Sequence, residues 1–125
     1  MGLLSGLFGN ASTTSTEDIV EKYNELFVTG EQIELAFKLI RDEYIFTNKR
    51  IIAIDNKSLS GKKKSFKTIS YKSISRYSIE SAGHFDLDAE LYIWIAGEQE
   101  PSISMEFSKG VNIYDVQQIL GAYVL

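Results

Sequence analysis

The sequence predicts a mainly β protein in which seven antiparallel strands form a small split barrel, capped by a C-terminal helix. Residues 32–55 hold three apolar segments separated only by two-residue links, as in a meander of β-hairpins. Residues 103–107 alternate apolar and polar side chains, the pattern of a half-buried strand. Asn112 then precedes an amphipathic stretch that runs toward the C-terminus, which is typical of a capped helix.

The first twelve residues carry four large apolar side chains between glycines, namely Leu3, Leu4, Leu7 and Phe8. We interpret residues 1–12 as an apolar N-terminal segment and residues 13–125 as one domain. The segment can dock on its own domain, pack against a neighbouring subunit or touch a membrane interface. Burying such a side chain contributes roughly 1.5–3 kcal/mol. A partner surface is therefore the expected destination, because a barrel closed by another helix has little room for four more apolar groups.

A first helix is predicted to begin within residues 12–16, which are rich in N-cap residues. Glu17 and Asp18 follow, where the helix dipole favours negative charge. The helix should end near Gly30, and its apolar stripe should pack on a sheet. That stripe consists of Ile19, Val20, Tyr23, Leu26 and Phe27.

The meander contains the strands that we expect to be most deeply buried. Residues 43–47 and 50–55 are apolar on both faces, so something must cover each face. Asn48 marks the expected hairpin tip, because asparagine tolerates the positive φ of tight turns.

Four further strands are expected at residues 65–71, 76–80, 89–96 and 101–107. The first of them lacks a regular alternation, which favours an edge position or a bulge. Residues 91–95, LYIWI, are apolar throughout and predict a central strand. Tyr92, Ile93, Trp94 and Ile95 are accordingly expected in the core.

Composition restricts the class of protein. A chain of 125 residues with 44% hydrophobic side chains is sufficient for a single domain with a real core. Cysteine is absent, which excludes disulfides and thiolate chemistry and favours a reducing cytoplasm. No apolar run approaches the roughly 20 residues needed to span a bilayer, and no signal peptide is expected. We therefore expect a cytoplasmic protein, or one peripheral to the membrane.

Charge is distributed unevenly along the chain. Residues 56–79 contain seven of the 13 cations and no carboxylate, so the remaining residues hold six cations and all 17 carboxylates, a net charge of -11. Such asymmetry can attract an anion, or let the basic face of one subunit meet the acidic face of another. The alternative is a solvated lysine loop.

No chemistry-bearing pattern stands out. His84, Asp86, Asp88 and Glu90 can be drawn as a metal site, but they lack the spacing of a calcium loop. A turn whose aspartates bond local N–H groups is the simpler interpretation. We expect no enzyme, cofactor or metal, and a pI of 5.0 argues against a nucleic-acid partner.

Four stretches carry a family resemblance: MGLLSGLFGNAS, IFTNKRIIAID, GKKKSFKTISYKSI and SAGHFDLDAELYIWI. Together they resemble the bacterial pleckstrin-homology-like family, long described as a domain of unknown function, over nearly the whole chain. The resemblance implies a PH-like split barrel, a tendency to assemble into homo-oligomeric rings and no assigned enzymatic activity. It does not imply phosphoinositide binding, because lipid-binding PH domains carry their basic motif between the first two strands. Here that link is Arg41-Asp42.

These observations favour an interaction module that self-associates and offers a surface to another macromolecule. The candidate interaction residues are Leu3, Leu4, Leu7, Phe8, Lys62, Lys63 and Lys64. The alternative is peripheral binding to anionic membrane lipids through the three lysines, with the apolar N-terminal segment beside them.

Overall fold

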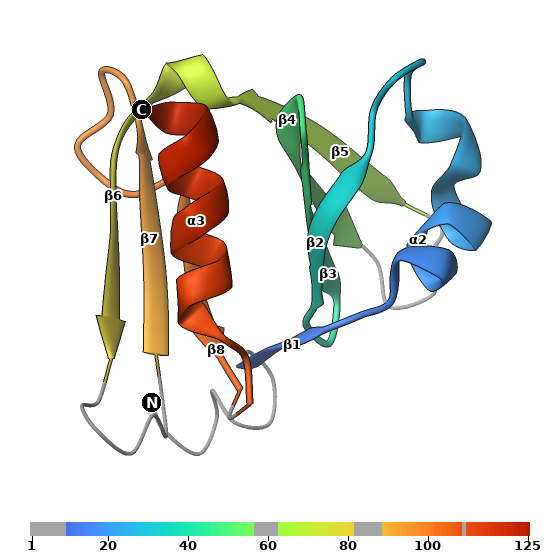
Figure 1. Ribbon diagram of the computed structural model, residues 1–125, viewed down its shortest axis with the longest axis horizontal. Coiled ribbons are helices and arrows are strands. Elements are labelled where there is room, and N and C mark those ends of the chain that lie inside the picture. The colour runs from blue at the N-terminus through green and yellow to red at the C-terminus, as the bar shows by residue number, and fades with distance from the viewer. Residues whose placement is uncertain (1–9, 57–62, 82–88, 109) are drawn as a thin grey trace. The chain divides into compact units, whose positions relative to one another are not determined.

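The computed structural model describes residues 10–56, 63–81, 89–108 and 110–125. They fall into two compact units, one within residues 13–70 and the other within residues 1–12 and 71–125. Figure 1 labels the elements of both units. Each unit has its own sheet and its own helix, and each is described by itself.

The unit within residues 13–70 is an antiparallel meander covered by a helix. Its strands pair in chain order, β2 with β3, β3 with β4 and β4 with β5. They are β2 (Ile33–Lys38), β3 (Asp42–Thr47), β4 (Arg50–Asn56) and β5 (Lys64–Ser70). Only Asn48 and Lys49 separate β3 from β4, as the sequence predicts. Strand β5 pairs with β4 alone among the described strands, so the predicted edge position is confirmed.

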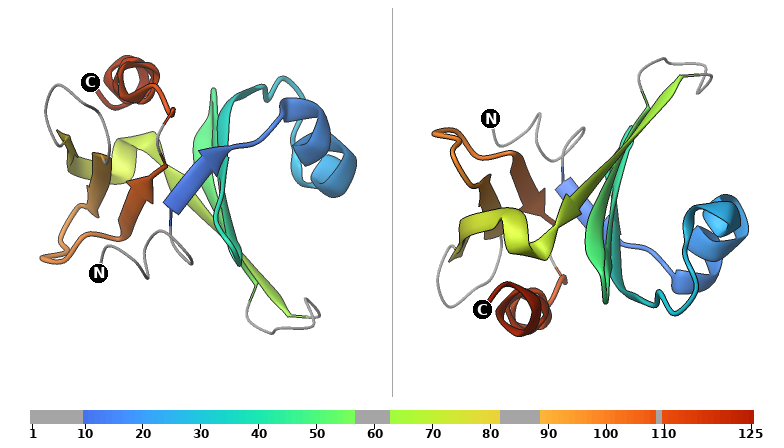
Figure 2. Two further views of the ribbon diagram at one scale, coloured as in Figure 1. Left: turned by 90° about the horizontal axis from the view of Figure 1, so that it is seen from below. Right: turned by 90° about the horizontal axis from the view of Figure 1, so that it is seen from above.

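Helix α2 (Thr16–Tyr23) begins where the sequence places it, since the Ser15 side chain accepts a hydrogen bond from the Asp18 N–H. It lies on one side of its sheet (Figure 2). Ile19 and Tyr23 pack there against Ile45, Ile52 and other residues of the meander. The predicted end near Gly30 is wrong, because a 3-10 helix (Asn24–Leu26) follows Tyr23 directly. Leu26 and Phe27 still reach the same core from this tighter turn.

Both faces of the meander are buried, as predicted. Ile45, Ile52 and Ile54 belong to the α2 side. Phe46 and Ile51, which are register partners, are also fully buried. Phe37 meets Phe46 edge to face, with ring centroids 5.8 Å apart, an arrangement that aromatic pairs favour.

The other unit is a second sheet with a helix on one face. Strands β6 (Ile74–Ser81), β7 (Ala89–Ile95) and β8 (Ile103–Phe107) form an antiparallel sheet with β7 in the centre. Helix α3 (Ile113–Val124) is capped by Asn112, whose side chain accepts from the Tyr114 N–H, as predicted. Figure 2 shows α3 end-on beside this sheet. Val116 and Leu120 are fully buried.

Two elements of this unit were not predicted from the sequence. Strand β1 (Asn10–Thr13) pairs in parallel with β8, and the Ser108 N–H donates to the Ala11 carbonyl at 2.8 Å. A 3-10 helix (Tyr71–Ser73) precedes β6, and Tyr71 stacks on Tyr123 of α3 with centroids 5.0 Å apart. With β1, the described residues form eight strands, one more than the seven predicted.

The expectation that residues 92–95 are core needs a correction. Ile93 is fully buried, but Tyr92, Trp94 and Ile95 are only half-buried. For Tyr92 and Trp94 the physical reason is the alternation of strand side chains, whereas Ile95 shares the parity of Ile93 and is the last residue of β7. Leu91 and Ile93 point to the buried side, so Glu90, Tyr92 and Trp94 occupy the opposite face of β7.

Candidate functional site

A polar network at the end of α2 is the most connected group of titratable side chains near the predicted lysines. The Tyr23 hydroxyl donates a short hydrogen bond to Glu43, and Lys22 Nζ lies 3.4 Å from the second Glu43 oxygen. Glu43 is 4% exposed. Burial, followed by the hydrogen bond and the charge of Glu43, raises the pKa of Tyr23. Tyr23 is therefore a fixed hydrogen-bond donor, and Glu43 is a carboxylate held by two partners.

Lys64 joins this network from β5. Its ammonium lies 3.2 Å from the Tyr23 hydroxyl and 5.0 Å from the Tyr23 ring centroid. Such a cation over an aromatic ring is stabilised by the ring quadrupole. Lys64 is half-buried, whereas Lys63 is exposed. The two described lysines of the predicted cluster thus differ in exposure, because Lys64 packs on the Tyr23 ring.

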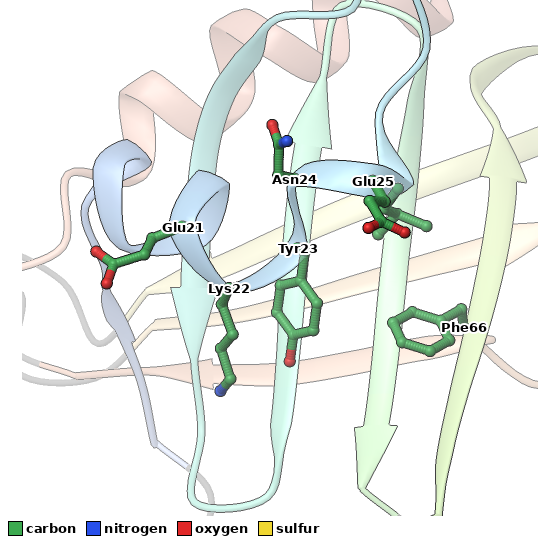
Figure 3. Close-up of a pocket in the computed structure, with 7 residues that line it drawn as sticks. Glu21, Lys22, Tyr23, Asn24, Glu25 and Phe66 are labelled. Atoms are coloured by element: carbon green, nitrogen blue, oxygen red, sulfur yellow. The ribbon is translucent and has the colours of Figure 1, made fainter.

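A surface groove lies between the end of α2 and β5 (Figure 3). It has a volume of about 470 Å³, and Tyr23, Leu26 and Phe66 supply its apolar lining. Phe66 is 49% exposed and meets Tyr23 edge to face at 6.0 Å. The polar lining of the groove comes from Glu21, Lys22, Asn24 and Glu25. Figure 3 shows Glu21 pointing away from Phe66. The groove offers an apolar contact with charges of both signs beside it.

A second buried network fixes the segment between α2 and β2 to the meander. Glu31, whose side chain is fully buried, pairs with Arg50 at 2.8 Å and 2.9 Å. It also accepts from the Thr47 hydroxyl at 2.7 Å and the Val28 N–H at 3.1 Å. The hydrogen bonds from Arg50 are the main cause that lowers the pKa of Glu31 to about 2. With every oxygen satisfied from within the unit, this network is structural.

The face of β6, β7 and β8 opposite their buried side chains carries an ordered set of polar and aromatic groups. Glu80, Glu90 and Glu106 are cross-strand partners in one row. Ser78, Tyr92 and Ser104 form the next row, and Arg76 is partnered with Trp94 beyond it. We call this set the outer face.

The aromatic part of the outer face is arranged by direct contacts. The Arg76 guanidinium lies 4.4 Å from the Trp94 ring centroid, and the Tyr92 and Trp94 rings are 6.1 Å apart. Burial, followed by the hydrogen bond and charge of Glu90 and then the charges of Glu80 and Glu106, raises the pKa of Tyr92. The same three glutamates therefore act together on the neighbouring row.

Several predicted residues lie outside the described part of the chain. These are Leu3, Leu4, Leu7, Phe8 and Lys62 of the interaction set, and His84, Asp86 and Asp88 of the metal alternative. In the residues that the structure does describe, no three His, Cys, Asp or Glu side chains are grouped to hold a metal ion. No helix within the described ranges is long and apolar enough to cross a membrane.

The outer face was not predicted from the sequence. The alternation within residues 89–95 offered a signal for it, since each buried aliphatic residue there is followed by a larger or polar one. The glutamate row offered none, because its members are separated by long stretches of chain.

Two curled sheets of short strands, an N-terminal helix and a capped C-terminal helix define a PH-like fold, and the comparisons with known proteins agree. A crystal structure of a DUF1696 family protein with a pleckstrin-homology domain, from Shewanella loihica PV-4, is 37% identical. It matches with a TM-score of 0.81 over 94% of this chain and 99% of that chain. The pleckstrin homology domain from Shewanella amazonensis SB2B is 38% identical, with a TM-score of 0.68 over 99% of both chains. The predicted fold class is confirmed.

The sequence comparisons identify the family of the chain. The family described as "Bacterial PH domain" matches residues 2–124. The uncharacterized protein YjqA of Bacillus subtilis (strain 168) is 51% identical over 122 residues, which is 98% of each chain. This protein belongs to the bacterial PH domain family, as the resemblance in its sequence indicates.

Proposed function

We propose that this bacterial PH domain is a non-enzymatic interaction module that assembles into a ring-like homo-oligomer and presents a surface to another macromolecule. The main observation that supports this proposal is the outer face. Tryptophan, tyrosine and arginine are the residues most enriched at binding hot spots. Trp94, Tyr92 and Arg76 contact one another on a face whose opposite side is the buried one.

Catalysis finds little support in the described residues. A general base must reach a substrate proton, and Glu43 is buried and already bonded to Tyr23 and Lys22. Glu31 is buried behind Arg50. The groove beside Phe66 contains no residue that is positioned as a nucleophile next to a base.

The apolar N-terminal segment is a second, independent argument for self-association. Residues 1–9 lead into β1, and Asn10 is the register partner of Glu106, the last member of the glutamate row. Leu3, Leu4, Leu7 and Phe8 precede β1 in the sequence. We propose that they contribute to the contact between copies.

The oligomeric mass tests this function. Light scattering at micromolar protein concentration should give a mass of several chains, and a mass of one chain at both low and moderate salt would overturn the proposal. Trp94→Ala should lower the mass, because it removes the largest side chain of the outer face. Tyr114→Ala is the matched control, since Tyr114 is 69% exposed on α3. Deleting residues 1–9 should also lower the mass while leaving β1 complete.

Binding to anionic lipid is a second candidate, favoured by the exposed Phe66 between basic residues of β5. Apolar and basic groups side by side are the usual ingredients of interfacial binding. Lys63 and Lys67 are exposed, so they are the cations to test. Co-sedimentation with phosphatidylglycerol vesicles should fall in a Lys63→Glu/Lys67→Glu variant. Equal binding by the variant and the wild type would exclude this function.

A further inference from the structure

Strand β5 is a regular edge strand of the meander. It keeps an unbroken register with β4 over its whole length, from Lys64 opposite Asn56 to Ser70 opposite Arg50. No other described strand pairs with it. An edge strand offers the backbone N–H and C=O groups of its outer side to an added strand, and proteins often prevent this with proline or a bulge. Residues 64–70 contain no proline, and their register with β4 shows no shift.

The side chains of β5 divide between the two faces of its sheet. Lys64 and Phe66 lie on the α2 side, because both contact Tyr23. Thr68 lies on the same side, where its hydroxyl accepts a hydrogen bond from Arg50 at 2.9 Å. An added strand therefore places every second side chain on the α2 side and the others on the opposite face.

The α2 side of this edge offers an apolar contact. Phe66 is 49% exposed and lines the groove beside Tyr23 (Figure 3). Lysines on an edge strand can be explained as protection against unwanted pairing. An exposed aromatic ring has the opposite effect, because covering it removes apolar surface from water. Phe66 thus favours a partner with an apolar side chain at this position.

Charge selects the rest of the partner. Residues 64–70 contain two lysines and no carboxylate. Lys67 is exposed, and strand alternation places it on the face opposite Phe66. The groove on the α2 side is lined by two glutamates and one lysine, so it does not attract further negative charge. Opposite charges on neighbouring strands are stabilising and like charges are destabilising, so carboxylates fit on the Lys67 face.

We propose that β5 binds an extended acidic segment of another protein by strand addition, with apolar side chains beside Phe66 and carboxylates on the Lys67 face. This inference rests on the proposed function and specifies the second macromolecule to which the module presents a surface. Backbone hydrogen bonds give such a contact its affinity, and alternate side chains give it specificity. The outer face, which belongs to the other unit, takes no part in it.

The test uses a synthetic peptide, TEVEFEVET, and the full-length chain. In an extended strand its phenylalanine and valines lie on one face and its glutamates on the other. The peptide reads the same in both directions, so it suits parallel and antiparallel pairing. Fluorescence anisotropy of the labelled peptide measures the dissociation constant. The charge-inverted peptide TKVKFKVKT should bind about tenfold more weakly or worse.

Substitutions on β5 locate the contact. Phe66→Ala and Lys67→Glu should each weaken binding of TEVEFEVET about tenfold or more. The Lys67→Glu variant should also bind TKVKFKVKT more tightly than the wild type does, which a misfolded variant could not do. Tyr114→Ala and Lys49→Glu change an exposed aromatic group and an exposed lysine elsewhere, and they should bind both peptides as the wild type does.

N-methylated peptides test the backbone pairing itself. In a strand the N–H groups of alternate residues point to opposite edges. Methylating the amides of the valines and the phenylalanine blocks one edge of TEVEFEVET, and methylating those of the glutamates blocks the other. One modified peptide should lose about tenfold or more in affinity, because several hydrogen bonds are lost together. The other should stay within about threefold of the unmodified peptide.

Each contrary result has a distinct meaning. An assembled wild type that does not bind TEVEFEVET would overturn strand addition while self-association stands. Equal affinity of the two N-methylated peptides would reject pairing with the β5 backbone. Binding to phosphatidylglycerol vesicles without binding to the peptide would overturn the acidic segment as the occupant and assign the surface to lipid. Light scattering on the same samples separates the two proposals, because a single-chain mass with retained peptide binding removes only the ring.

Discussion

The Arg50→Met substitution should destabilise the domain severely, because it leaves Glu31 as an unpaired buried carboxylate. Arg50 donates two hydrogen bonds to Glu31 and a third, at 3.0 Å, to the Leu26 carbonyl. Breaking a buried pair by removing one partner costs about 3–5 kcal/mol. For a domain of this size, that loss lowers the melting temperature by roughly 10–20 °C. Since whole domains have only about 5–15 kcal/mol of stability, the variant should be near its limit.

The pH dependence of stability gives an independent measure of the same network. The pKa of Glu31 falls from its usual 4.5 to about 2, which corresponds to about 3 kcal/mol. Because the folded pKa is the lower one, this stability is present above about pH 4.5 and is lost as the pH falls toward 2. The Arg50→Met variant should lack most of this acid-induced loss.

Urea unfolding from about pH 7 to pH 3, under conditions where the chain is monomeric, measures both effects. Arg76→Met is the matched control, because Arg76 is exposed and contacts one ring face. Its loss should stay within about 1 kcal/mol. An Arg50→Met cost below about 1 kcal/mol at neutral pH, or an acid limb equal to that of the wild type, would refute the role assigned to this pair.

Three further substitutions test other parts of the structure. Tyr23→Phe should cost about 1–3 kcal/mol in urea unfolding, because Glu43 loses a buried donor. A neutral result would mean that water replaces the hydroxyl. Glu90→Gln should raise the unfolding free energy of the monomer by about 0.5–1 kcal/mol at low salt, since it removes both like-charge pairs of the row. A decrease, or a gain that does not shrink with added salt, contradicts that reasoning. Leu120→Ala should cost about 2–5 kcal/mol, because Leu120 is fully buried on α3. A thermal shift of only a degree or two would show that α3 contributes little to its unit.

Local patterns in the sequence account for most of the elements. Two-residue links, alternating side chains and the caps at Ser15 and Asn112 act through contacts within a few residues, so they can be seen without the fold. Strand β1 could not be foreseen in this way. Its residues, NAST, have no strand pattern, and its conformation is supported by pairing with β8, more than ninety residues later.

The early end of α2 has a similar origin. The apolar stripe continues in helical register to Phe27, but Tyr23 is held at Glu43 of β3 and the chain tightens into a 3-10 turn. Packing against the meander overrides the local helical preference, which is a weak influence by comparison.

The sequence by itself determined the strand and helix order, the family and the concentration of positive charge in residues 56–79. It also identified Lys63 and Lys64, but tertiary structure decided that Lys64 packs on Tyr23 and is half-buried, while Lys63 is exposed. The outer face belongs wholly to the tertiary structure. Glu80, Glu90 and Glu106 become neighbours only through the register of three strands, because cross-strand pairing brings together residues that no local pattern connects.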